Sequence, residues 1–155
     1  MTDQIINFFH LLATTIWIGG IMYLHFVLFP ALKHIDPQQS GKLQGLIAKR
    51  FSIIAWSCVV VVLITGYLKT PDGFLFDSTS DMGVTLMVKH IFIIGMIAAG
   101  LTITLYIVPS MQKAAPTPGS APQPEFFKQQ KNLKTFAMIN LILGILVIAC
   151  ASMLW

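Results

Sequence analysis

Four long apolar runs, separated by three polar loops, make up most of the chain. The runs extend from Ile5 to about Leu28, from Phe51 to Leu68, from about Val84 to Val108 and from Phe136 to Trp155. About 20 apolar residues cross the hydrocarbon core of a bilayer as a helix, so each run predicts one transmembrane helix. Pro30 and Pro109 follow the first and third runs, where we expect them to end the helices. The pattern predicts an all-α integral membrane four-helix bundle with antiparallel up-and-down topology.

The three loops differ in charge, and this difference predicts the orientation of the bundle. The first loop, residues 31–50, carries four basic residues against one acidic residue, and the third loop, residues 110–134, also carries four against one. The second loop, residues 69–83, carries three aspartates against one lysine. Because loops rich in Lys and Arg stay in the cytoplasm, we expect the first and third loops inside. The second loop and both termini are then outside. The Pro-rich stretch APTPGSAPQP predicts a flexible linker within the third loop.

The composition supports a membrane protein and excludes other classes. The chain of 155 residues is 55% hydrophobic and 10% charged, with a mean hydropathy of +0.77, whereas soluble domains carry about 25% charged residues. We interpret it as one multi-pass domain in a lipid bilayer, such as the bacterial inner membrane. The net charge of +4 comes from loops that flank the spans, without the aromatic-interleaved basic patch of a nucleic-acid site. Cys58 and Cys150 fall in different spans, which excludes a secreted disulfide scaffold.

Two histidines occupy equivalent positions in the first and third predicted helices. His10 lies about five residues into the first helix and His90 about six residues into the third, and both helices start outside. His10 precedes Pro30 by twenty residues and His90 precedes Pro109 by nineteen, so the two helices form a faint parallel repeat. At 1.5 Å per residue the two rings lie at one depth, on helices that are diagonal in a sequentially connected bundle. Because ionisable groups inside membrane spans usually mark a site, we predict that His10 and His90 are the axial ligands of one haem b. The alternative is that each histidine bonds to a neighbouring helix.

Lys89 and Trp17 are the predicted neighbours of this haem. Lys89 lies inside the third span and is predicted either to reach the interface or to pair with a haem propionate or an anionic substrate. Trp17 is two turns below His10 on the same face, where it packs against a macrocycle or forms part of the core. His25 has no partner at its depth, and we expect it to bond within the bundle or to lipid headgroups.

Methionines keep a copper site open as the alternative. Met22 and His25 are three residues apart, as are Met87 and His90, so that each pair shares a helix face. Thioether and imidazole ligands together suit copper(I). Residue types alone therefore leave haem b and copper as competing predictions.

Several stretches resemble a known group of membrane proteins. HLLATTIWIGGIMYL resembles the first-helix pattern of the copper resistance protein D (CopD) family and of the HemJ-type protoporphyrinogen oxidases. RFSIIAWSCVVVVLITGYLKT and GVTLMVKHIFIIGM, which contains Lys89, are similar to the CopD domain. The HemJ-type oxidases have a histidine early in helix one and a lysine early in a later helix, which His10 and Lys89 match. The resemblance implies a four-helix membrane unit with a haem- or copper-related role.

These observations lead to one main functional prediction and two alternatives. The main prediction is a cytochrome b-like redox protein that works in electron transfer or porphyrinogen oxidation, with a membrane or outer-face redox partner. The alternatives are a copper transport or resistance protein and a non-catalytic subunit of a larger membrane complex. Whether the chain is an enzyme and whether it forms a homo-oligomer are both left open. No nucleic-acid partner is expected.

Overall fold

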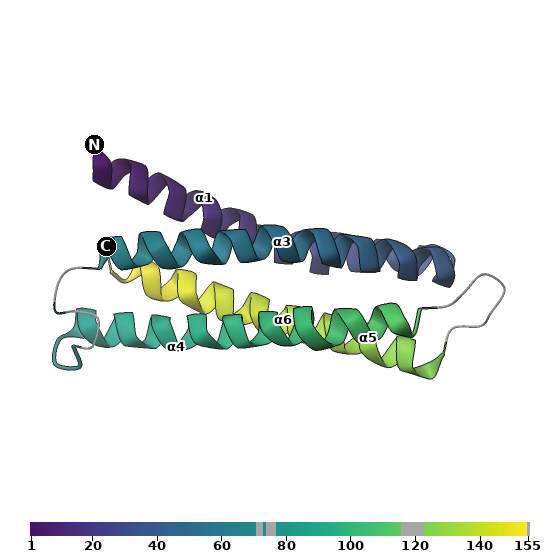
Figure 1. Cartoon of the computed structure of the whole chain (residues 1–155). Helices are drawn as coiled ribbons and strands as arrows, with labels where there is room; N and C mark the ends of the chain where they lie inside the picture. Colours follow the sequence, from purple (N-terminus) through teal and green to yellow (C-terminus); the bar gives the residue numbers. More distant parts are fainter. Residues whose placement is uncertain (71–72, 74–76, 116–122, 155) are drawn as a thin grey trace.

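The computed structural model describes residues 1–70, 73, 77–115 and 123–154, and these residues form helices without any strand (Figure 1). The elements are α1 (Thr2–Tyr23), the π-helix η1 (Leu24–Leu28), α2 (Phe29–Ala31), the 3₁₀-helix η2 (Leu32–His34), α3 (Pro37–Lys69), α4 (Asp81–Thr102), the π-helix η4 (Ile103–Ile107), α5 (Val108–Lys113) and α6 (Pro124–Ser152). They make four rods that are long and apolar enough to cross a membrane: Thr2–His34, Gln38–Lys69, Asp81–Lys113 and Pro124–Ser152. The predicted all-α membrane four-helix bundle is confirmed.

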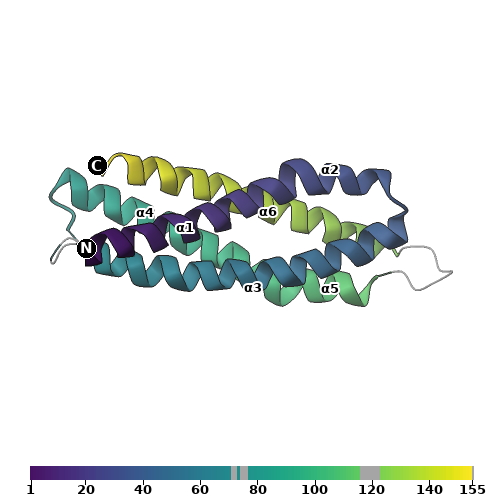
Figure 2. The same ribbon diagram turned by 90° about the horizontal axis from the view of Figure 1, so that it is seen from above.

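The four rods are arranged as two helical hairpins. α1 packs mainly along α3, and α4 packs mainly along α6. Contacts of α1 with α6 and of α3 with α5 join the hairpins into one bundle (Figures 1 and 2). Both termini lie at the same end as the connection between α3 and α4, as up-and-down topology requires (Figure 1).

The prolines do not end the first and third rods, so this part of the sequence prediction is wrong. Each proline follows a π-helix and lies inside a continuous rod. The backbone N–H of Phe29 bonds to the carbonyl of Leu24, and that of Val108 bonds to the carbonyl of Ile103, five residues back in each case. A proline breaks an α-helix because it lacks an N–H and its ring clashes with the carbonyl four residues earlier. The wider π turn relieves this conflict, and the helix continues.

The second and fourth rods begin earlier than the apolar pattern predicts. α3 begins at Pro37 rather than at Phe51, and α6 begins at Pro124 rather than at Phe136. Asp36 caps α3, because its Oδ1 accepts hydrogen bonds from the backbone N–H groups of Gln38 at 2.9 Å and Gln39 at 3.3 Å. Most of the predicted first loop is therefore helical. Residues 116–122, which contain most of the predicted Pro-rich linker, lie outside the described residues.

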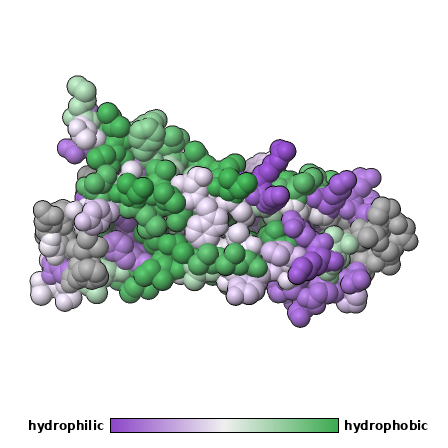
Figure 3. All heavy atoms as spheres, in the orientation of Figure 1, coloured by the Kyte–Doolittle hydropathy of each residue, from purple (hydrophilic) through white to green (hydrophobic). Residues whose placement is uncertain are grey.

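The extra helical turns extend the bundle beyond the membrane at one end. A rod of 33 residues is about 50 Å long, whereas the hydrocarbon core of a bilayer is about 30 Å thick. Hydrophilic side chains gather at the end of the bundle that holds α5 and the start of α6, next to a strongly hydrophobic middle (Figure 3). Large apolar side chains along the rods, such as Phe8, Phe26 and Ile94, are exposed, and lipid covers them in an integral multi-pass membrane protein.

Two hydrophobic clusters hold the rods together. The first, which we call the central cluster, contains Ala13, Trp17, Ile18, Ile21, Cys58, Val59, Val62, Met96 and Leu141. The second, the end cluster, lies near the extended end and contains Phe29, Leu32, Ile107, Val108, Met111, Ala114, Phe126, Leu133 and Ala137. The end cluster includes residues on both sides of each proline, so the helical continuation past the prolines contributes directly to packing.

The described part of the second loop forms a capped start for α4. The Ser80 hydroxyl accepts a hydrogen bond from the backbone N–H of Gly83 at 3.1 Å, and it donates to the carboxylate of Asp77. Hydrogen bonds from the side chains of Ser80 and Thr79 lower the pKa of Asp77 to about 2. This carboxylate is therefore ionised at neutral pH. It contributes to the negative charge from which we predict that the loop lies outside.

The predicted orientation can be checked by thiol labelling. We expect Ser78→Cys to react with a membrane-impermeant maleimide added to intact cells, in a background where Cys58 and Cys150 are alanine. Gln123→Cys, exposed at the opposite end, is expected to react only after the cells are permeabilised. Labelling of Gln123→Cys in intact cells, with Ser78→Cys protected, would reverse the orientation.

Candidate functional site

A chain of hydrogen bonds fixes the ring of His10 near the end of the bundle that holds both termini. His10 Nδ1 lies 2.7 Å from the Thr65 hydroxyl of α3. The same hydroxyl donates to the carbonyl of Val61 at 2.6 Å, so its single proton is already used. Thr65 must therefore accept from His10, which places the imidazole proton on Nδ1. Nε2 then carries the free lone pair of the ring, and the hydrogen bond to Thr65 fixes the orientation of the ring.

Two lysines lie close enough to His10 for their charges to act on its ring. Lys69, at the end of α3, donates to Asn7 Oδ1 at 2.6 Å, and Asn7 lies on α1 three residues before His10. The ammonium groups of Lys69 and of Lys89 on α4 both act electrostatically on the His10 ring. Lys69 also acts on Lys89, which forms no ion pair within the described residues. We call Asn7, His10, Thr65, Lys69 and Lys89 the cationic cluster.

The charge of the cationic cluster decides which ligands suit it. Two ammonium groups beside a partly buried imidazole raise the local positive potential in a region of low dielectric. An anionic group gains from that potential, whereas a bare metal cation bound to His10 is repelled by it. The charge of the cluster therefore suits an anionic group better than a bare metal cation.

His90 occupies a position in α4 similar to that of His10 in α1, but no hydrogen bond joins the two rings within the described residues. Its position is nine residues after the start of α4, and that of His10 is eight residues after the start of α1. The half-buried His90 ring interacts with the backbone of Leu86 one turn earlier and with the charge of neighbouring Lys89. Shared binding of one ligand by His10 and His90 stays a prediction.

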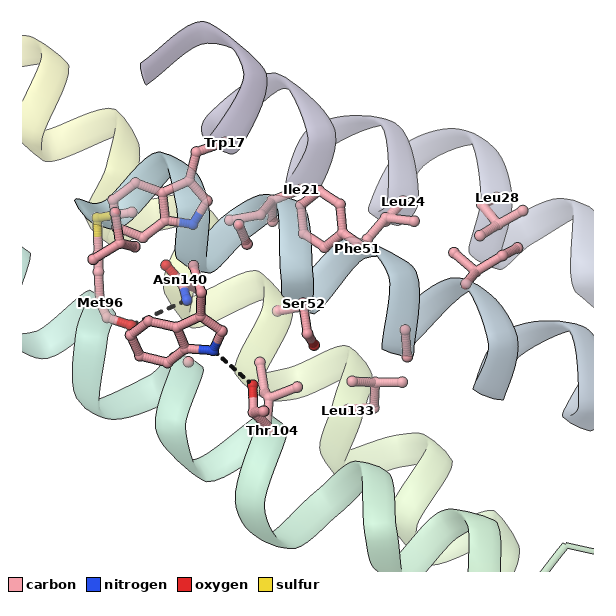
Figure 4. Close-up of a pocket in the computed structure, with 18 of the residues that line it drawn as sticks. Trp17, Ile21, Leu24, Leu28, Phe51, Ser52, Met96, Thr104, Leu133 and Asn140 are labelled. Atoms are coloured by element: carbon pink, nitrogen blue, oxygen red, sulfur yellow. Dashed lines mark hydrogen bonds between the residues drawn. The ribbon is translucent and has the colours of Figure 1, made fainter. Parts of the chain in front are cut away.

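Trp17 belongs to the protein core. Its side chain is 6% exposed, packs in the central cluster and lines a cavity between the helices (Figure 4). The first of the two predicted roles, a wall of a haem site, stays a prediction, whereas core packing accounts for the observed burial.

Of the two predicted Met–His pairs, Met22 and His25 lie in different surroundings. Met22 is 45% exposed on the outer surface. The His25 ring makes edge-on contacts with Phe26 and Phe29, with centroid distances of 5.4 and 6.0 Å, and its buried Nδ1 has no hydrogen-bond partner. No group of three His, Cys, Asp or Glu residues gathers anywhere in the described ranges.

Sequence reasoning missed three members of the cationic cluster. Asn7 lies one helical turn before His10, and Lys69 is a lone base at the end of a span, so both carried a usable signal. Thr65 is an ordinary residue for a membrane helix, and only the packing of α1 on α3 shows that it bonds to His10.

The fold and the cationic cluster together define a four-helix membrane protein with an orientated histidine beside two lysines. Residues 45–154 match the family described as Copper resistance protein D, and the chain belongs to this CopD family. The match covers Thr65, Lys69, Lys89 and His90, whereas His10 and Trp17 lie before it.

One curated relative is an uncharacterized protein of Aquifex aeolicus (strain VF5). It is 28% identical over 101 residues, which cover 63% of this chain and 70% of the relative. No solved structure matches the chain. Through its family, the chain is therefore a membrane protein related to copper resistance.

Proposed function

We propose that this protein binds one haem b at the cationic cluster and acts as a membrane redox protein of the cytochrome b type. The observation that carries the proposal is the hydrogen-bond chain from His10 through Thr65 to Val61, which leaves His10 Nε2 free to bind iron. His90, at the matching position on α4, is the proposed second axial ligand. Bound haem supplies one-electron chemistry, and the protein supplies the ligands, the charge and the apolar surroundings.

The lysines favour haem over a bare copper ion. Haem b carries two propionates, and Lys89 offers a half-buried ammonium group without an ion-pair partner in the described chain. Pairing with a propionate turns an unfavourable buried charge into a favourable pair. We propose Lys89 as the propionate partner, with Lys69 adding to the positive potential.

Copper handling is the second candidate, and the family description favours it. In this alternative Met87, His90 and His10 hold a copper ion in transit as substrate. Met87 and His90 share a face of α4, but the two ammonium groups near His10 oppose a second positive charge. The third candidate is a non-catalytic subunit, in which His10 only joins α1 to α3.

We also propose a cellular setting for this activity. The positively charged end of the bundle lies in the cytoplasm and the cationic cluster near the outer face of a bacterial inner membrane. A redox partner would approach from the outer face or within the membrane, either to exchange electrons or, for porphyrinogen oxidation, to accept them from the protein. The lipid bilayer is the solvent for the outward apolar residues.

The proposal is tested by the cofactor content of the purified protein and of two Lys89 variants. Wild type is expected to show a Soret band and about one haem per chain, without stoichiometric copper. Lys89→Met is expected to lose most of the haem, because a propionate loses its charged partner in a region of low dielectric. Lys89→Arg, which keeps the charge, is expected to retain much of it. Haemochrome assay and elemental analysis give both contents.

Each other outcome points to a different candidate. Stoichiometric copper without haem would favour the transport alternative, and a colourless, copper-free protein would favour the subunit. Equal haem content in wild type and Lys89→Met would make Lys89 an interface residue only.

A further inference from the structure

A second site lies away from the cationic cluster, in the middle of the bundle. A cavity of about 770 Å³, measured together with its open side, is bounded by all four rods (Figure 4). Trp17, Phe51 and Met96 are among its walls. Among the described lining residues there is no histidine and no charged side chain, so neither propionates nor a metal ion are matched there.

The side chain of Asn140 in the wall of this cavity lacks one hydrogen bond. Asn140 is 4% exposed, and its Nδ2 donates to the backbone carbonyl of Met96 at 3.2 Å. A carbonyl can only accept, so the amide orientation is fixed by its partner. Asn140 Oδ1 is then left buried without a donor. An unpaired buried acceptor is costly in an apolar environment, and such a group calls for a ligand that donates.

A second unpaired amide atom has a simpler explanation. Gln44 is 1% exposed, its Oε1 accepts from Gln130 at 2.8 Å, and its Nε2 has no partner. Gln44 lines the central cavity and also borders a separate pocket, lined by Lys33 and Lys134, at the hydrophilic end of the bundle. Water at that end can satisfy Gln44. Asn140 comes ten residues after Gln130 on α6, which places it about 15 Å further along the helix. It does not line that pocket.

The walls around Asn140 specify the shape of the ligand. Trp56 lines the cavity with its indole held in place, because Nε1 donates to the Thr104 hydroxyl at 3.2 Å. Trp17 and Phe51 add aromatic surface from α1 and α3 (Figure 4). Flat aromatic rings pack well against such walls. Aliphatic residues continue the cavity toward the end cluster: Leu24, Leu28, Ile103 and Leu133.

We propose that this cavity binds a neutral, lipid-soluble molecule with a hydroxylated aromatic head, of the phenol or hydroquinone class. The hydroxyl donates to Asn140 Oδ1, the ring lies among the aromatic walls, and an apolar tail follows the aliphatic part of the cavity. This binding site does not depend on haem at the cationic cluster.

The hydrogen-bond donor is tested with two ligands that differ only in that group. We expect the full-length protein in lipid nanodiscs to bind 4-nonylphenol saturably, at about one per chain above the uptake of empty nanodiscs. Its methyl ether, 4-nonylanisole, has no donor and is expected to bind about tenfold more weakly or worse. Equilibrium binding with each labelled ligand gives the ratio of the two affinities. Equal affinities would overturn the proposal, as would the absence of saturable phenol binding.

Variants locate the site. Asn140→Leu is expected to bring the affinity ratio close to one. Gly100→Leu is expected to abolish saturable binding of both ligands, because a Cβ at Gly100 already lies 3.7 Å from the Trp56 ring and 3.9 Å from Asn140 Nδ2. Ala98→Leu, exposed on the same helix, is the matched control and is expected to bind like wild type. A ratio that persists in Asn140→Leu, or full binding by Gly100→Leu, would contradict the assignment. If Asn140→Leu does not fold, the comparison of Gly100→Leu with Ala98→Leu still tests whether the ligand binds in this cavity.

The same equilibrium binding measurement on His10→Ala tests whether the cavity binds its ligand independently of the proposed haem. Phenol binding there is expected to match wild type, whether or not that variant contains haem. Loss of phenol binding in His10→Ala with the fold retained would show that the two sites are not independent.

Discussion

His10→Ala is expected to lose haem or to convert a low-spin, six-coordinate spectrum into a high-spin one. The proposed ligand atom is His10 Nε2, which the hydrogen bond from Nδ1 to Thr65 leaves free. His90→Ala is expected to have the same effect, since the proposed ligand pair comes from equivalent positions on α1 and α4. The visible spectrum and the haem content of the purified variants measure both results. We expect at least a tenfold loss of six-coordinate haem, because one strong axial bond is removed.

His25→Ala is the control for this pair of variants. His25 is fifteen residues after His10, about 22 Å further along the helix, and its ring packs against Phe26 and Phe29. The visible spectrum of His25→Ala is expected to match that of the wild type. Loss of haem in His25→Ala with retention in His90→Ala would refute the proposed ligand pair.

Phe126→Ala is expected to lower the free energy of unfolding by about 3–5 kcal/mol, the range for deletion of a fully buried aromatic ring. Phe126 is 1% exposed and belongs to the end cluster. Its ring packs directly on the backbone of α3, where a Cβ at Gly41 would lie only 2.5 Å from Phe126 Cζ. The variant leaves a cavity between α3 and α6 beyond the membrane. Thermal unfolding in a fixed detergent and amide hydrogen exchange of residues 124–134 measure the effect.

The neighbouring residue supplies a matched control. Phe127 has the same side chain on the same helix but is 50% exposed. Phe127→Ala is expected to change the stability by about 0.5 kcal/mol or less, as is usual for surface substitutions. Similar losses in the two variants would mean that the ring at position 126 is not a packing residue of a folded extension.

The number and class of the helices were predictable because they depend on long apolar runs, which a membrane requires. The ends of the helices were not. Pro30 is a helix breaker by its local chemistry, and only the π turn before it lets the helix continue. The first turns of α3 and α6 are polar on their outer faces, so an apolar pattern assigns them to loops although buried residues such as Phe126 hold them together.

The candidate site was predictable only from one side. His10 and Lys89 are unusual residues for a membrane span, and their rarity identified them. The contact of His10 with Thr65 depends on how α1 is rotated against α3, which sequence spacing within one helix does not determine. The unpaired oxygen of Asn140 likewise follows from the position of the Met96 carbonyl on another helix.

The order of features along the two hairpins has an evolutionary meaning. Each hairpin has a first rod with a histidine near its start, a π turn and a proline, and each has a second rod that opens on a proline, Pro37 or Pro124. Such a parallel repeat is the record expected from duplication and fusion of a gene for a two-helix protein. In the ancestral pair of identical hairpins the two histidines would have been related by a twofold axis. The residue before the histidine is Phe9 in one hairpin and Lys89 in the other, so the two hairpins differ in charge beside their histidines.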